Sequence, residues 1–259
     1  MDEIYLQLKN RYEASAYSPY IIRTDWQIIR RIGVHPALAT IKDLEQVVLR
    51  ATKQSTKANY VSRLKSIYTH LNKMDLVNGN NPAADLPKPK GVKGVPKPVT
   101  KNEWAKLMAE AQQPYKDWFI IGGMAGLRCM EVAKLQGADL IENNGNYSLH
   151  IIGKGNTDCI VPVAKQVADV IKSYNTFGRL WDITPNTFSK KAANEMRRIL
   201  GPDAKHFHSL RHYFGTTMLE KSNGDIMAVR DLMRHSSVAT TQVYTQLQEG
   251  KTRDLVNLL

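Results

Sequence analysis

Apolar residues recur at helical spacing through the first 85 residues, and basic side chains fill the positions between them. A helix is predicted wherever a capping residue precedes such a stripe, which occurs at Ser18-Pro19, at Thr40 and at Ser55. The first stripe consists of Ile21, Ile22, Ile28, Ile29 and Ile32, and the third of Tyr60, Leu64, Ile67, Tyr68 and Leu71. Basic residues off these stripes include Arg23, Arg30, Arg31, Lys57, Arg63 and Lys65. The pattern predicts a four-helix bundle over residues 1–85, with basic outer faces suited to binding DNA.

The periodicity stops at residues 86–100, which read LPKPKGVKGVPKPVT. Proline removes backbone donors and disfavours helix in the residue before it, so this piece should be extended. We interpret it as a basic linker between two domains. Its lysines could follow a phosphate backbone or simply keep a spacer solvated.

Helical patterning returns from residue 101 to residue 259, interrupted once. Thr100 and Glu103 have the spacing of a capping box, and helices are predicted from there through Lys134. Residues 147–153 and 159–163 alternate like two short strands. Helices resume near Lys165, Thr184, His208, Asp225 and Ser237. The predicted second domain is mainly α with a small antiparallel β hairpin.

Charge and composition narrow the class of partner. The 259 residues carry a formal net charge of +12, which favours a polyanion because each neutralised phosphate releases counterions. Cys129 and Cys159 lie outside any CxxC motif, so a disulfide scaffold is not expected. The first residues lack the pattern of a signal peptide, and the apolar run at residues 118–127 is too short to span a bilayer. We therefore expect a soluble, cytoplasmic protein with no membrane partner.

Residues 205–219, KHFHSLRHYFGTTML, concentrate histidines around Arg211. The i, i+4 spacing of His208 and His212 could suit a metal, but no HExxH is present and the cationic Arg211 lies between them. His212 could equally be a packing residue, and His206 has no assigned role. No metal or other cofactor is expected.

Five short elements occur in series along the second half of the chain. In chain order they are AGLRCME at residues 125–131, GKG at residues 153–155, HSLRH at residues 208–212, Arg234-His235, and Tyr244 nine positions after His235. Together they closely resemble the tyrosine recombinases of the phage integrase family, in the two-domain form without an arm-binding domain. The resemblance implies an N-terminal helical domain that binds core DNA and a catalytic domain over residues 101–259.

The resemblance also implies the chemistry, a site-specific recombinase that cuts and rejoins DNA through a 3′-phosphotyrosine without ATP or metal. Arg128 and Arg211 would bind the phosphate with paired donors and permanent charge. Tyr244 would be the nucleophile, His208 its partner in proton transfer, Lys154 the acid for the departing 5′ oxygen, and His235 a hydrogen-bond donor to phosphate. Glu131 would orient the cations, and His212 would support His208 and Arg211 by packing or a hydrogen bond.

The expected partners are double-stranded DNA core sites and further copies of the chain. In the family, a C-terminal tail commonly docks on a neighbouring protomer, so residues 251–259 are expected to join a dimer on each site and a tetramer in synapsis. Arg234 departs from the pattern, because the family usually has glycine there; it could touch DNA or distort the turn before His235. Two alternatives remain, a type IB topoisomerase-like enzyme and a non-catalytic helical DNA-binding regulator.

Overall fold

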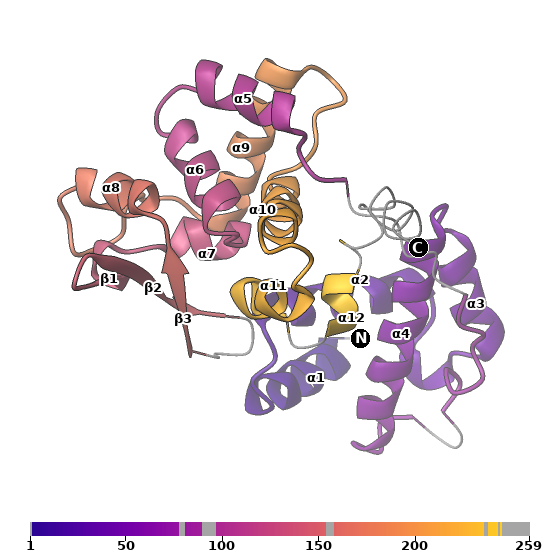
Figure 1. The fold of residues 1–259 in the computed structure, drawn as a ribbon. Helices are drawn as coiled ribbons and strands as arrows, with labels where there is room; N and C mark the ends of the chain where they lie inside the picture. Colours follow the sequence, from indigo (N-terminus) through magenta and orange to yellow (C-terminus); the bar gives the residue numbers. More distant parts are fainter. Residues whose placement is uncertain are drawn as a thin grey trace. The chain divides into compact units, whose positions relative to one another are not determined.

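The computed structural model of the chain describes residues 2–77, 81–89, 97–153, 158–235, 238–242 and 244 (Figure 1). The chain divides into two compact units, Met1–Gly94 and Val95–Leu259. The fold is mainly helical with one small antiparallel sheet, which confirms the predicted fold class. Each unit is described by itself.

The described residues of the first unit form four helices around an apolar core. They are α1 (Asp2–Ala14), α2 (Pro19–Ile32), α3 (Ile41–Leu49) and α4 (Gln54–Asn72), with the 3₁₀ turn η1 (Pro36–Leu38) between α2 and α3. The Ser18 hydroxyl accepts a hydrogen bond from the amide of Ile21, and Thr40 and Asp43 form a capping box, as their residue types predict. The cap of α4 is Lys53, so the start predicted at Ser55 was wrong by a short distance.

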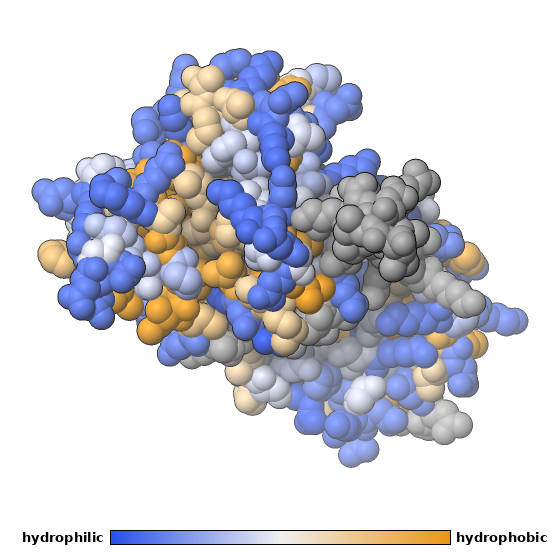
Figure 2. Space-filling model, viewed as in Figure 1, coloured by the Kyte–Doolittle hydropathy of each residue, from blue (hydrophilic) through white to orange (hydrophobic). Residues whose placement is uncertain are grey.

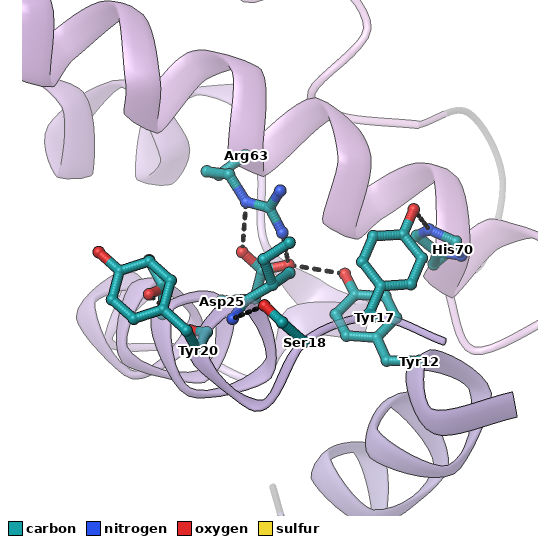
Figure 3. A network of polar contacts seen from close by, with 9 residues as sticks. Tyr12, Tyr17, Ser18, Tyr20, Asp25, Arg63 and His70 are labelled. Carbon is teal, nitrogen blue, oxygen red and sulfur yellow. Dashed lines mark hydrogen bonds and ion pairs between the residues drawn. The ribbon is translucent and has the colours of Figure 1, made fainter. Parts of the chain in front are cut away.

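A buried carboxylate lies inside this unit (Figure 3). Asp25 is fully buried; Tyr12 donates to its Oδ2 at 2.8 Å, and Arg63 donates through Nε to Oδ1 at 2.6 Å and through Nη2 to Oδ2. Burial and the neighbouring Asp25 raise the pKa of Tyr12. The expectation that Arg63 belongs to the outer basic face was therefore wrong, because a buried carboxylate needs a charged partner.

The second unit holds the remaining helices of the described chain. They are α5 (Lys101–Glu110), α6 (Tyr115–Met124), α7 (Cys129–Lys134), η2 (Gly137–Asp139), α8 (Lys165–Ser173), α9 (Pro185–Leu200), α10 (His208–Lys221), α11 (Ile226–Met233) and α12 (Val238–Thr241). The capping box of Thr100 and Glu103 begins α5 as predicted. Helix α6 contacts α5, α7, α8, α9 and α10, so the apolar run of the sequence is a central helix with neighbours on most sides.

The sheet has three antiparallel strands in the order β1 (Leu140–Asn143), β2 (Asn146–Ile152) and β3 (Asp158–Val163). Only β2 and β3 were predicted. Leu149 pairs with Val161 on the core face, whereas Ile152 and Ile160 are 59% and 68% exposed on the other face. Figure 2 shows apolar side chains reaching the surface over these strands. Among the described residues, the structure has no helix that is both long and apolar enough to cross a membrane.

Candidate active site

The first arginine of the site lies where a loop turns into α7. Gly126 has φ 62°, and a Cβ on it would collide with the ring of Phe214, so only glycine fits this turn. Arg128 is the N-cap of α7; its backbone amide donates to Oε2 of Glu131 at 2.7 Å and its Nη1 to Oε1 at 2.9 Å. The Arg128 side chain is 36% exposed, so Glu131 holds a guanidinium that solvent still reaches.

The second arginine is anchored within the unit. Arg211 of α10 is 1% exposed and donates to the backbone carbonyls of Gly126 and Met233. Burial, together with repulsion from Arg128 and Arg234, lowers the pKa of Arg211 to about 10. It is still a cation at neutral pH, and its two carbonyl partners fix its direction.

A third guanidinium belongs to Arg234, at the C-cap of α11. Its Nη2 donates to Oε2 of Glu131 at 2.9 Å, so this carboxylate bridges Arg128 and Arg234. Burial alone would raise the pKa of Glu131, but the charge of Arg234 and the hydrogen bonds from Arg128 lower it below its ordinary value. Arg234 was expected either to touch DNA or to distort the turn, and its ion pair with Glu131 was not anticipated.

The nucleophile predicted from the sequence is packed inside its own chain. Tyr244 is 1% exposed and lies in an apolar cluster with Met233. A Cβ on Gly215 would come within 2.6 Å of Met233 Sδ and 2.9 Å of the Tyr244 ring, so α10 needs glycine here. Burial raises the pKa of Tyr244 to about 12, although the charges of Arg211 and Arg128 oppose it. Gly215 was not predicted, since nothing local in the sequence reveals its contact with Tyr244.

His212 contacts the tyrosine hydroxyl. Its Nδ1 lies 2.9 Å from Tyr244 Oη, and the ring of His208 meets the His212 ring edge-on at a centroid distance of 4.6 Å. Burial, His208 and Arg211 lower the pKa of His212 to about 4. Desolvation, Arg211 and Arg128 also lower the pKa of His208. The sequence interpretation gave the proton-transfer role to His208 and a supporting role to His212, whereas the structure brings His212 to the hydroxyl.

His235 lies just after Arg234, the C-cap of α11. Its Nδ1 lies 2.9 Å from Oγ1 of the buried Thr241, and its ring is nearly parallel to that of Tyr244 at 6.4 Å. Burial and the charges of Arg211 and Arg128 lower the pKa of His235 to about 4. Thr241 thus holds the imidazole beside the nucleophile.

The structure brings five of the six predicted site residues into one unit, and α7, α10, α11 and α12 that carry or flank them can be followed in Figure 1. These residues are Arg128, His208, Arg211, His235 and Tyr244. The sixth, Lys154, lies outside the described residues. Within the described part of the chain, no three His, Cys, Asp or Glu side chains gather as a metal site would require. Guanidiniums, neutral imidazoles and a phenol around one point suit the binding and attack of a phosphate ester.

Known proteins resemble the chain in sequence. Residues 97–251 match the phage integrase family. A tyrosine recombinase XerC of Agrobacterium fabrum (strain C58) is 31% identical over 260 residues, covering 86% of this chain and 80% of its own. A tyrosine recombinase of Pseudothermotoga lettingae is 27% identical, covering 83% and 81%.

Solved structures share the fold. A lambda integrase fragment, residues 75–356, in a dimer bound to a COC′ core site has a TM-score of 0.72 at 14% identity, covering 93% of this chain and 96% of its own. The XerH site-specific recombinase in a post-cleavage complex with its difH substrate has a TM-score of 0.67 at 18% identity, covering 85% and 72%.

Proposed function

The chain belongs to the phage integrase family and is a tyrosine-type site-specific recombinase, and on this premise we propose how it cuts and rejoins DNA. Tyr244 Oη attacks the scissile phosphorus, so that an Oη–P bond forms while the P–O5′ bond breaks. The DNA is then attached through its 3′ phosphate, and a 5′-hydroxyl is released. Attack by a 5′-hydroxyl from the partner strand reverses these steps and frees Tyr244. No ATP is needed, because the phosphotyrosine keeps the bond energy.

Arg128 and Arg211 stabilise the charge that collects on the nonbridging oxygens. Guanidiniums give paired donors with a permanent charge, and their effect is large where water is excluded. Glu131 orients Arg128, and the carbonyls of Gly126 and Met233 orient Arg211. Both cations are therefore held in place before DNA arrives, so little reorganisation accompanies the reaction.

The contact between His212 and Tyr244 is the observation that carries the mechanism. A tyrosine with a pKa of about 12 is protonated at neutral pH, so its proton must leave as the Oη–P bond forms. His212 is neutral and lies 2.9 Å from that hydroxyl, so its Nδ1 can accept the proton. His208, against the His212 ring, would pass the proton toward the phosphate.

The departing oxygen and the phosphate need donors of their own. When Thr241 donates its hydroxyl proton to Nδ1 of His235, Nε2 carries the imidazole proton and can donate to a phosphate oxygen. Lys154 remains the proposed acid for O5′, carried over from the sequence resemblance; it lies outside the described residues.

The partner of this site is double-stranded DNA. We assign core-site binding to residues 1–85, the linker to residues 86–100 and catalysis to residues 101–259. Two chains would bind each site and four would meet in synapsis through residues 251–259, which lie outside the described part of the chain. The lambda integrase structure is that of a dimer on a core site, which supports the proposed binding of two chains to one site. The place of action would be the host cytoplasm or nucleoid.

A covalent adduct tests the function. The protein is incubated with nicked DNA from the junctions that flank its own locus, and protein–DNA species that resist SDS are measured. Tyr244→Phe should abolish the adduct and preserve salt-sensitive DNA binding. Tyr213→Phe is the matched control, because Tyr213 lies on α10 with its ring stacked on Trp104 and should keep the adduct. An adduct that survives Tyr244→Phe would disprove the assigned nucleophile.

A further inference from the structure

Arg234 occupies a backbone position that costs a side-chain-bearing residue free energy. Its φ of 54° and ψ of 48° are left-handed, at the point where α11 ends. Glycine adopts this conformation without strain, whereas other residues rarely do. Local strain of this kind is often found where a functional group must be aimed in one direction.

The guanidinium of Arg234 is also incompletely bonded. Its side chain is 9% exposed, and Nη2 is engaged by Glu131. Nε and Nη1 are both buried and have no hydrogen-bond partner. Among the described residues, the other buried side-chain nitrogen in this condition is the neutral indole of Trp118. Leaving the donors of a buried cation unpaired costs folding free energy. A partner from outside the chain that accepts hydrogen bonds from Nε and Nη1 would remove this cost.

The charges around Arg234 indicate the sign of that partner. Arg128, Arg211 and Arg234 repel one another, and Glu131 supplies the negative charge among them. Three guanidiniums and one carboxylate leave two positive charges uncompensated. A phosphodiester carries one negative charge, and the five-coordinate phosphorus of its transition state carries two. The cluster therefore matches a phosphate whose charge increases during the reaction.

We propose that Arg234 is a third phosphate-binding arginine, whose Nε and Nη1 donate to a nonbridging oxygen of the scissile phosphate. This rests on the proposed function, which supplies the phosphate. Both nitrogens are shielded from water in the free chain, so the contact forms as the surroundings of Arg234 rearrange around the bound phosphate. Nη2 stays hydrogen-bonded to Glu131, which holds the guanidinium of Arg234 beside that of Arg128.

The first experiment uses inorganic phosphate and the full chain without DNA. Binding is measured as the rise in melting temperature with phosphate, with chloride holding the ionic strength constant. Arg234→Gly should weaken phosphate binding about tenfold, the effect of roughly one charge-assisted contact. It should leave the melting temperature without phosphate nearly unchanged, because relief of the left-handed strain and of the repulsion among three guanidiniums offsets the lost ion pair with Glu131.

The control for this experiment is Arg230→Gln. Arg230 lies on the same helix and pairs with its neighbour Asp231, so its loss removes the same charge away from Glu131. It should bind phosphate like the unaltered protein. Equal phosphate affinity in Arg234→Gly and the unaltered protein would overturn the proposal.

The second experiment separates contact with phosphate from an effect relayed through Glu131. Adduct formation is compared on DNA with a normal scissile phosphate and with a methylphosphonate there, which lacks one charged oxygen. On normal DNA, Arg234→Gly should slow the adduct by about ten- to a hundredfold. On one methylphosphonate diastereomer that penalty should shrink at least about tenfold.

A penalty that is the same on both DNAs would show that Arg234 acts only by positioning Glu131 and Arg128, and the phosphate contact would be refuted. The two proposals fail differently. If the unaltered protein forms no adduct on any flanking DNA, the proposed function fails, while the phosphate titration still decides the role of Arg234.

Discussion

Replacing Glu131 with glutamine removes one charge and preserves the shape of the side chain. Glu131 receives three hydrogen bonds from charged or N-capping groups, at 2.7 Å from the Arg128 amide, 2.9 Å from Arg128 Nη1 and 2.9 Å from Arg234 Nη2. Glutamine keeps one carbonyl acceptor and places an amide donor where a guanidinium already donates. Three mutually repelling guanidiniums would then lack a counterion among the described residues.

The expected loss follows from these contacts. A hydrogen bond to a charged group contributes about 1.5–3 kcal/mol, and breaking a buried pair by removing one partner costs about 3–5 kcal/mol. Two of the three contacts of Glu131 lose their charge complement, so we expect the free energy of unfolding to fall by about 3 kcal/mol. This is roughly two powers of ten in the unfolding equilibrium constant.

Urea unfolding followed by tryptophan fluorescence measures this loss. The distinguishing result is that phosphate recovers the lost stability. An anion that binds only the folded state raises the free energy of unfolding by about 2.7 kcal/mol when its concentration is about a hundred times its dissociation constant. Glu195→Gln is the matched control. Glu195 and Glu131 are both 8% exposed, but Glu195 pairs with a single arginine, Arg198. Phosphate should stabilise Glu131→Gln more than it stabilises Glu195→Gln or the unaltered protein, because both of these keep Glu131 as the counterion of the arginines. An equal gain in all three proteins, or an undiminished stability of Glu131→Gln, would refute the reasoning.

Two further predictions concern other charged or titrating groups. The pKa values of His212 and His235 are lowered from 6.5 to about 4 by burial and by neighbouring groups, among them Arg211, so the unfolded chain binds protons that the folded chain does not. The free energy of unfolding should be highest above about pH 6.5 and should fall as the pH drops toward 4, by up to about 1.4 kcal/mol per pH unit for each histidine. His212→Gln should reduce this slope in urea titrations between pH 7 and pH 5. An unchanged slope would contradict the lowered pKa of His212. In the first unit, Asp25→Ala should cost about 3–5 kcal/mol because it leaves Arg63 without its partner, whereas Asp25→Leu combined with Arg63→Met should cost much less; a double variant as unstable as the single one would argue against a charge effect.

Local signals in the sequence predicted the helix starts well. The caps at Ser18, Thr40 and Thr100 depend on residues within one turn, so their spacing alone identifies them. Strand β1 was missed because its four residues, LIEN, are too short and too polar to alternate visibly. It forms only because β2 provides hydrogen-bond partners.

Contacts between distant residues could not be predicted in the same way. The positions of Arg128, Arg211 and Tyr244 were expected from their order along the chain, and Glu131 was expected to orient the cations, but the partners of Arg211 and Tyr244 were not predicted. The hydrogen bond between Tyr244 and His212 spans 32 residues, and the pair of Arg63 with Asp25 spans 38. Such partners depend on how helices pack, and a polar residue on a helix gives no sign of the neighbour it will meet. That Arg234 is unusual was visible in the sequence only as an arginine where the resembling family has glycine, and the structure adds that its backbone is left-handed.

Arg211 connects two segments that lie far apart in the sequence. Its guanidinium donates hydrogen bonds to the carbonyl of Gly126, before α7, and to the carbonyl of Met233, at the end of α11. Any replacement by an uncharged residue would break both contacts and remove a cation from the reaction in a single step. An inactive Arg211 variant therefore cannot by itself distinguish a chemical defect from a collapsed scaffold. A single side chain thus serves both the catalysis and the architecture of this part of the fold.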